Sequence, residues 1–439
     1  MTFTFQKRLT LFIGLIVFIG QSSSAFSDSS SPKLRLEVTS TDKPKLSLIE
    51  GPLSLNQAVI IALEHNPSLH AKQTMLRALQ YEILQAGLPP NPKLKFEIEN
   101  FAGSGTASGL SGSELTTEVS QELELLGKRS KRAKIASLKA DLVIYDIAAF
   151  KLKLINEVET AFTTLLESQS LKKVSEKNLL RAEKSLEVFE TLLDSGKIST
   201  LSVNRAKLAV SEARELLYEA NSEETKAASN LKSKLGGVIR EVSAKGNLSP
   251  HSLTAASSKN ITLSNHPLML MEKVRIKIAE TTHDLERAQR ISNMELSAGV
   301  RHSRETNENS AVAGLSIPLP LFNRNQGEVR AASERINQAK EDARITEHYL
   351  NNRLEKLKAD LLSASKRCEE YTKNTILTAQ LSIENIDEAY SSGKASLLEV
   401  LDSKEVLFRI EQGRIRANAD LIRTQNTLNT FFQLLPRNL

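Results

Sequence analysis

The chain has 439 residues, enough for two or three ordinary domains, yet only 5% of them are aromatic and there is no Trp. A composition dominated by Ala, Leu, Glu, Lys, Ser and Asn is typical of long helices and argues against a single compact core. The formal net charge is +6, and acidic and basic side chains are interspersed along the chain, which argues against a nucleic-acid-binding surface.

Residues 1–25 have the pattern of a secretory signal peptide. A basic start is followed by an apolar stretch from Leu9 to Gly20 and by small residues, with cleavage predicted after Ala25. The apolar stretch is short for a bilayer span, and an uncleaved N-terminal anchor is the alternative. We expect residues 26–51, which are rich in Ser, Thr, Pro and Lys, to form an extended arm.

The rest of the chain repeats itself once. The Ser-Gly-Lys triplet at Ser195 returns at Ser392, an offset of 392 − 195 = 197, and the segment around Pro67 returns around Pro267 at nearly the same spacing. Such spacing predicts a tandem duplication of one structural unit. The two predicted repeats and the linker between them occupy residues 52–236, 261–436 and 237–260.

Each predicted repeat begins with short helices and then changes to the alternating pattern of β-strands. In the first repeat, Leu94, Phe96 and Ile98 alternate with charged residues, and a loop rich in Gly and Ser precedes the returning strand. We predict β-hairpins over residues 93–125 and 294–321, with strands of roughly ten residues, a length that spans a bilayer when tilted. The alternative is that these hairpins cap a soluble helical domain, because four strands alone cannot close a barrel.

A long helical hairpin follows each pair of strands. Residues 128–194 contain neither Gly nor Pro, which predicts a helix of roughly 100 Å. Helical hairpins are predicted over residues 128–235 and 326–435, and each Ser-Gly-Lys triplet is interpreted as a tip, where Gly closes the helix in the left-handed conformation. Three copies would supply twelve strands to one closed barrel and their helices to a tube.

Five segments, in this order along the chain, carry a resemblance to a known family. They are SLNQAVIIALEHNPSL, QAGLPPNPKLKFEIENF, LELLGKRSKRAKIA, IPLPLFNRNQGEVRAA and SSGKASLLEVLDSKEVLF. Together they resemble the TolC-like outer-membrane efflux proteins, most of all the branch of heavy-metal resistance-nodulation-division systems, over residues 52–435. The resemblance implies a mainly α fold with a small β part. In it, duplicated long helical hairpins form a trimeric α-barrel, and four strands per chain contribute to a 12-stranded transmembrane β-barrel.

The function that this resemblance implies is an exit duct in the outer membrane. The duct would passively conduct a substrate, with metal cations as one candidate, and its tunnel would project into the periplasm. The implied partners are two further copies of the chain, a periplasmic adapter protein, an inner-membrane resistance-nodulation-division pump and outer-membrane lipid, with no nucleic acid. The alternative is a periplasmic coiled-coil adapter or scaffolding protein without a pore, but an adapter would show one helical hairpin where this chain shows two.

The resemblance also assigns functional residues at the two tips. The positions that match the family's acidic gate are Glu399 and Asp402, which share a helix face and would form stacked carboxylate rings around a threefold axis. Arg205 matches Asp402 at the repeat offset, 402 − 205 = 197, and we predict a contact between them, joining neighbouring hairpins, as a brake on opening. The residues expected to dock the adapter are Ser195, Gly196, Lys197, Ser199, Ser392, Gly393, Lys394 and Ser396.

Simpler interpretations compete with these assignments. An acidic pair just after a helix start also complements the helix dipole, and Lys197 and Lys394 are equally interpreted as solvated turn residues. The seven histidines are scattered, and the single cysteine, Cys368, has no partner for a disulfide. We therefore predict no catalysis, no cofactor and no resident metal, and a hydrolytic or metal-binding enzyme is the weakest alternative.

Overall fold

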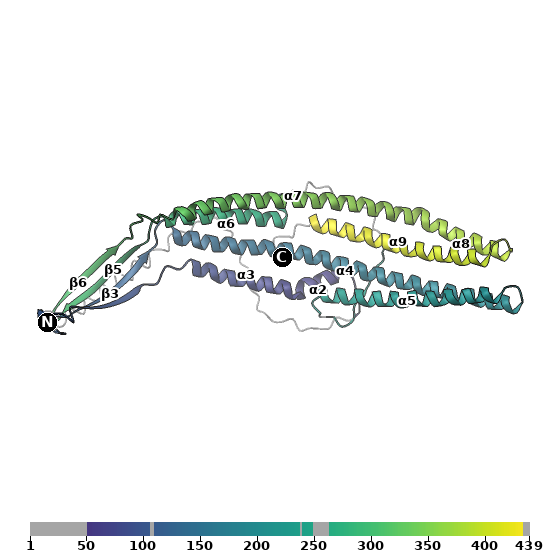
Figure 1. Cartoon of the computed structure of the whole chain (residues 1–439), viewed down its shortest axis with the longest axis horizontal. Helices are drawn as coiled ribbons and strands as arrows, with labels where there is room; N and C mark the ends of the chain where they lie inside the picture. The colour runs from purple at the N-terminus through teal and green to yellow at the C-terminus, as the bar shows by residue number, and fades with distance from the viewer. Residues whose placement is uncertain (1–50, 106–108, 238, 249–262, 433–439) are drawn as a thin grey trace. The chain divides into compact units, whose positions relative to one another are not determined.

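The computed structural model describes most of the chain after the predicted N-terminal arm. The described residues are 51–105, 109–237, 239–248 and 263–432. The predicted signal peptide, almost all of the arm and part of the linker lie outside these ranges. The described residues belong to one unit, Leu48–Leu439, with a small sheet at one end and two helical tips at the other (Figure 1). The predicted fold class, mainly α with a small β part, is confirmed.

Short helices open both halves of this unit. Ser54 and Gln57 form a reciprocal capping box at the first helix, and Asn66 caps the second helix, which starts with a proline. In the second half, the ring of His266 accepts the capping hydrogen bond. The three helices are α2 (Leu55–His65), α3 (Pro67–Ala86) and α6 (Pro267–Gln289).

Four antiparallel strands form the main sheet in the order β2-β3-β5-β6. The two predicted strand pairs therefore lie side by side, joined through β3 and β5. The bounds are β2 (Lys93–Glu99), β3 (Glu114–Leu123), β5 (Met294–Ser303) and β6 (Glu308–Ser316). Ile317 and Leu319, which continue the alternating pattern in the sequence, lie beyond the end of β6. A separate pair of two-residue strands, β1 (Pro52–Leu53) and β4 (Ser243–Ala244), is parallel.

The two faces of the main sheet differ in chemistry. Register places Leu94 opposite Val119, Val119 opposite Ala298 and Ala298 opposite Ala313, so one face is apolar across all four strands. Large side chains on this face stay open to the surroundings in the single chain, with Phe96 66% exposed. The opposite face is charged, and Arg301 there lies 3.2 Å from Glu114 on the neighbouring strand. The sheet thus presents an apolar surface on one face and a charged surface on the other.

Two long helical hairpins make up most of the unit. The first consists of α4 (Lys128–Asp194), with 67 residues, and α5 (Thr200–Lys234). The outgoing arm of the second is interrupted: α7 (Gln326–Glu370) ends in a π-helical turn, η3 (Tyr371–Thr375), before α8 (Ile376–Ser391) continues to the tip. The chain returns as α9 (Leu397–Phe432). The sequence predicts one unbroken helix here, because residues 328–392 contain neither Gly nor Pro, and the structure corrects this expectation.

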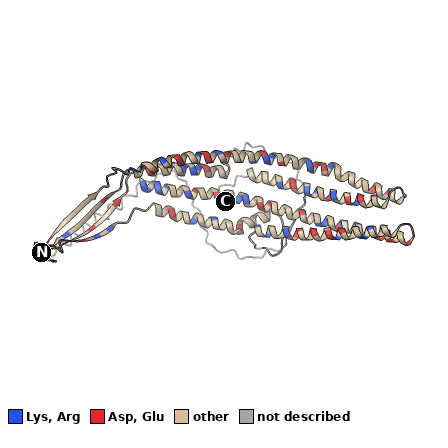
Figure 2. Cartoon of the chain, viewed as in Figure 1, with Lys and Arg blue, Asp and Glu red and all other residues tan. Residues whose placement is uncertain are grey.

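Much of the packing between the helices is apolar. The largest core cluster lies under α2, where Val158 and Leu165 of α4 and Leu231 of α5 are fully buried. Acidic and basic residues are interspersed along the helices (Figure 2), as the mixed charge pattern predicts. None of the helices in the described ranges has an apolar stretch long enough to cross a bilayer.

Candidate functional site

The first tip is a compact helix end closed by Gly196. This glycine has φ +71°, the left-handed conformation that a side chain would disfavour. Its N–H donates to the Leu193 carbonyl at 2.8 Å, and the Lys197 N–H donates to the Leu192 carbonyl at 2.9 Å. These two bonds satisfy carbonyls that the end of α4 would otherwise leave unpaired, in the pattern of a Schellman motif.

The second tip repeats this geometry at the end of α8. Gly393 has φ +74°, its N–H donates to the Tyr390 carbonyl at 3.0 Å, and the Lys394 N–H donates to the Ala389 carbonyl at 2.8 Å. The residues predicted for adapter docking are all exposed in the single chain, and they are Ser195, Gly196, Lys197, Ser199, Ser392, Gly393, Lys394 and Ser396. Their exposure leaves both tips available for contact with another protein.

The two tips pack against each other through an apolar cluster. Phe189 is 2% exposed, and Leu397 and Leu401 of α9 belong to the cluster around it. Its ring meets that of Tyr390 edge to face, with 6.2 Å between ring centroids. Phe189 and Tyr390 are 390 − 189 = 201 positions apart, so the cluster joins the two tips into one end surface.

Glu399 and Asp402, the predicted gate residues, are both exposed at the start of α9. Glu399 is part of a capping box, in which the Ser396 N–H donates to its carboxylate at 2.6 Å and its own N–H meets the Ser396 hydroxyl at 3.4 Å. The hydrogen bond from the Ser396 backbone lowers the pKa of the Glu399 carboxyl. Glu399 therefore has a capping role in addition to any role in a gate.

Arg205 is exposed on α5 and does not meet Asp402 within one chain. Among the ion pairs of the described ranges, none involves Arg205 or Asp402. The predicted brake would thus have to join hairpins of neighbouring copies, and it stays a prediction.

A family model for the outer membrane efflux proteins matches residues 59–237 and 260–432, which include both tips and both strand pairs. The chain belongs to this family. As a member of the family, the protein is an outer-membrane efflux component whose helical tunnel lies in the periplasm.

A relative matches nearly the whole chain, and solved structures share its fold. The cobalt-zinc-cadmium resistance protein CzcC of Cupriavidus metallidurans is 27% identical over 98% of this chain and 100% of that protein. Crystal structures of CusC match with a TM-score of 0.74 and 17% identity, covering 88% of this chain and 95% of that one. The outer membrane protein VceC of Vibrio cholerae matches with a TM-score of 0.71 and 18% identity, covering 86% and 95%. These structures show the same fold.

Within this efflux fold, α4 and α9 meet along a polar seam that sequence analysis missed. The two guanidinium nitrogens of Arg181 donate to the Glu411 carboxylate at 2.9 and 3.0 Å. Nearer the sheet, Arg423 pairs with Glu167, and the Thr430 hydroxyl donates to Glu159 at 2.9 Å. Burial lowers the pKa of the Arg423 guanidinium, as expected for a partly desolvated pair. The seam fixes the register between the two hairpins.

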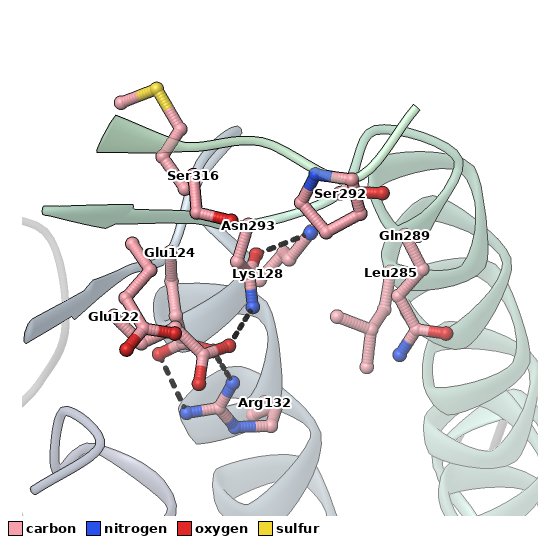
Figure 3. Close-up of a pocket in the computed structure, with 12 residues that line it drawn as sticks. Glu122, Glu124, Lys128, Arg132, Leu285, Gln289, Ser292, Asn293 and Ser316 are labelled. Carbon is pink, nitrogen blue, oxygen red and sulfur yellow. Dashed lines mark hydrogen bonds and ion pairs between the residues drawn. The ribbon is translucent and has the colours of Figure 1, made fainter. Parts of the chain in front are cut away.

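A second polar network lies where the sheet meets the helices, beside a cavity of about 550 Å³. Lys128, the first residue of α4, is 6% exposed, and its ammonium donates to the Ile291 carbonyl at 2.6 Å and to the Asn293 side chain. The Asn293 amide in turn donates to Glu122 at 2.6 Å (Figure 3). Burial lowers the pKa of Lys128. Through this network the start of the first long helix holds the α6–β5 turn of the other half.

No grouping of three or more His, Cys, Asp or Glu side chains that could hold a metal ion occurs in the described ranges. Cys368 is buried, and its thiol donates to the Asn418 side chain at 3.1 Å. Burial raises the pKa of this thiol, which favours its unreactive neutral form.

Proposed function

We propose that three copies of this chain form one passive duct through the outer membrane, which conducts metal cations delivered by a periplasmic adapter and an inner-membrane pump. The observation that carries the proposal is the two-faced sheet with open edges. Strands β2 and β6 are its edges, and their directions are opposite. Strand β6 of one copy can therefore pair with β2 of the next in the antiparallel sense, and three copies close a ring of twelve strands.

The chemistry of the two faces supports a membrane-spanning ring. A closed ring leaves no backbone group unpaired in lipid, its apolar face with Leu94, Phe96 and Ile98 would contact acyl chains, and its charged face would line water. The charged face carries Glu97, Glu114 and Glu118 among its carboxylates, so the proposed lumen favours cations over anions.

Metal cations are proposed as the substrate because the matched relatives are named for resistance to cobalt, zinc, cadmium and nickel. A passive duct needs no tight metal site, since tight binding would slow exit. Substrate choice and energy would then reside in the pump. The chain belongs to a family of efflux channels, and we propose no enzymatic activity for it.

The exposed tips support docking of an adapter at the end distant from the sheet. Both tips present a lysine, Lys197 and Lys394, beside exposed backbone and hydroxyl groups. Such a surface offers hydrogen-bond donors to an acidic or polar partner helix.

The test is conductance of the purified mature protein in planar bilayers, with a divalent cation added from the tip side. Discrete, cation-preferring conductance that the divalent ion blocks is the expected result. Folded, detergent-extracted protein that forms no pores would overturn the proposal and favour a periplasmic scaffold.

A further inference from the structure

Four connections join the main sheet to the helices, and all of them lie at the same end of the sheet (Figure 1). Strands β2 and β5 begin at this end, whereas β3 and β6 finish there. We call the four connections, together with the first turn of α4, the collar. It consists of residues 87–92, 124–131, 290–293 and 317–325.

Each connection of the collar presents a large apolar side chain to the surroundings of the single chain. Leu88, Leu126 and Ile291 are exposed in the first three connections, and Leu319 and Phe322 are exposed in the fourth. Phe322 is the most open of them, at 92% exposed. In the sequence, Leu319 continues the alternation that puts the apolar residues of β6 on one face. The apolar surface of the sheet therefore extends into the collar.

Three arginines of the collar are exposed and have no carboxylate partner. They are Arg129 in the first turn of α4, Arg290 directly after α6 and Arg324 before α7. Among the ion pairs of the part of the chain that the structure describes, none contains any of the three. The Arg324 side chain donates to the Leu321 carbonyl at 3.3 Å, which does not neutralise its charge. Each guanidinium is thus available to an anion outside the chain.

The collar as a whole is basic. It contains five basic residues and one acidic residue, a formal charge of 5 − 1 = +4 per chain. The acidic residue, Glu124, pairs with Arg132 just beyond the collar. Helix stability does not explain Arg129, because a basic residue in the first turn opposes the helix dipole. The collar therefore keeps a positive charge that its own carboxylate does not offset.

The collar lacks the aromatic residues that usually mark a membrane boundary. Trp and Tyr are enriched at the edges of membrane-spanning segments, but this chain contains no Trp, and all six of its tyrosines lie in helices. An arginine also suits such a boundary, since its apolar stem stays in the apolar layer while its charge reaches the phosphate groups. The exposed arginines and apolar side chains together supply the chemistry of a boundary.

We propose that the collar binds anionic phospholipids of the periplasmic leaflet, with Arg129, Arg290 and Arg324 on the phosphate groups and the apolar side chains among the acyl chains. This inference rests on the proposed function, because it needs the sheet to span the membrane. Basic residues close to an anionic membrane surface are attracted to it. The collar thereby sets how deep the sheet sits in the bilayer.

A second copy of the chain is the competing occupant of the collar. Ring closure through β6 and β2 brings only the connections next to these edge strands to a neighbouring copy. Leu126 and Ile291 belong to the connections of the central strands β3 and β5, so a neighbour leaves them uncovered. The cavity beside Lys128 and Asn293 has none of the three arginines in its lining, so they are not part of that polar network. Lipid is therefore the occupant that reaches all four connections.

Quenching of Trp fluorescence tests the proposal, because the chain has no Trp of its own. Phe322→Trp places a reporter in the collar, and Phe101→Trp places one beyond the opposite end of the sheet, where Phe101 is also exposed. Each variant is reconstituted in vesicles of phosphatidylglycerol and phosphatidylcholine at equal mole fractions, with one or the other lipid brominated. The ratio of the two quenching constants should be about five at position 322 and about one at position 101.

Replacing the three arginines shows whether they create this preference. The triple variant Arg129→Ala, Arg290→Ala, Arg324→Ala, made in the collar reporter protein, should lower the ratio to about one. The matched control removes the same charge elsewhere, from Arg214, Arg344 and Arg353, which are exposed on the helices. It should leave the ratio unchanged. A preference that survives loss of the collar arginines would overturn their role.

Salt gives a second measurement if the triple variant does not assemble. In the Phe322→Trp protein, about 1 M NaCl should lower the ratio to about one, because exposed charges are screened at that ionic strength. A ratio that does not respond to salt would overturn the proposal.

The remaining outcomes separate the collar from the duct. Equal quenching by the two lipids at position 322, in protein that forms pores, would overturn the collar and leave the duct intact. Absence of quenching by both lipids in pore-forming protein would show that a neighbouring copy covers Phe322, and would also overturn it. Protein that neither inserts into the vesicles nor forms pores would overturn the duct itself.

Discussion

The two helical hairpins have the same order and nearly identical tips, but they are held together differently. The first hairpin runs unbroken through α4 for 67 residues and is covered by α2 and α3 through buried contacts such as Leu69 and Leu165. The second hairpin contains the π-turn, a glycine opposite it and a capping box at its tip. The two hairpins thus share a backbone path and differ in these local features.

The polar seam between α4 and α9 ties the two hairpins of one chain together. Each ion pair of the seam takes one residue from each hairpin of the same chain, as in Arg181 with Glu411. The hydrogen bond to Glu411 raises the pKa of Arg181. Neither hairpin can satisfy these groups alone. Substitutions that remove a contact of the seam, or a feature found in one hairpin but not in the other, therefore test these differences.

The largest expected effect is on the seam. Arg423→Ala would leave Glu167, which is 15% exposed, without its partner, and should lower the free energy of unfolding by about 2 kcal/mol. Chemical denaturation of the detergent-solubilised protein measures this change. Lys226→Ala, which removes an exposed pair with Glu223 on the first hairpin, is the control and should cost less than about 0.5 kcal/mol. Equal costs would mean that the seam contributes no more than a surface ion pair.

The second expected effect concerns the acidic pair found in one hairpin alone. At the offset of 197, Glu399 and Asp402 correspond to Ser202 and Arg205. Glu399→Gln with Asp402→Asn should weaken block by divalent cations about tenfold in bilayer recordings. Gln preserves the capping box at this position, so the comparison isolates charge from helix capping. Unchanged block would remove these residues from the gate and leave them as helix-start residues.

A smaller effect is expected at the two helix starts. Ser396→Ala should lower hydrogen-exchange protection in the first turn of α9 about fivefold, because the cap is lost. Ser199→Ala should change little at α5, since the Ser199 side chain makes no capping hydrogen bond. The hydrogen bond from the Ser396 backbone lowers the pKa of the Glu399 carboxyl. The stabilisation that the ionised carboxylate gives the helix start is therefore complete at pH values above the ordinary Glu pKa of about 4.3. It should be lost only as pH falls through the lower folded value. Equal protection in both variants would contradict the difference between the tips.

The smallest expected effect concerns Arg205. If it restrains opening through Asp402 of a neighbouring copy, Arg205→Ala should raise the open fraction about twofold, the amount typical of one exposed ion pair. High salt should produce a similar rise in the unmodified protein. Unchanged conductance in Arg205→Ala would count against the brake.

The sequence alone determined the features that rest on local rules. Gly196 and Gly393 mark the tips because a helix ends most easily in the left-handed conformation. The alternation of Leu94, Phe96 and Ile98 predicted a strand, since successive side chains point to opposite faces. A helix-start role was predicted for the acidic pair Glu399 and Asp402 from the helix dipole, and in the structure Glu399 forms a capping box with Ser396.

The tertiary structure decided what depends on distant partners. Arg423 and Glu167 are 256 residues apart, and their pairing follows from the register of two packed helices, which no local pattern encodes. The π-turn Tyr371–Thr375 contains no Gly or Pro that would predict it, and the Tyr371 ring lies against Gly413 of another helix. Helical hydrogen bonds join residues about four positions apart, so the sequence indicates local features such as the tips and the strand pattern. Packing between distant segments decides which side chains meet and where a helix is interrupted.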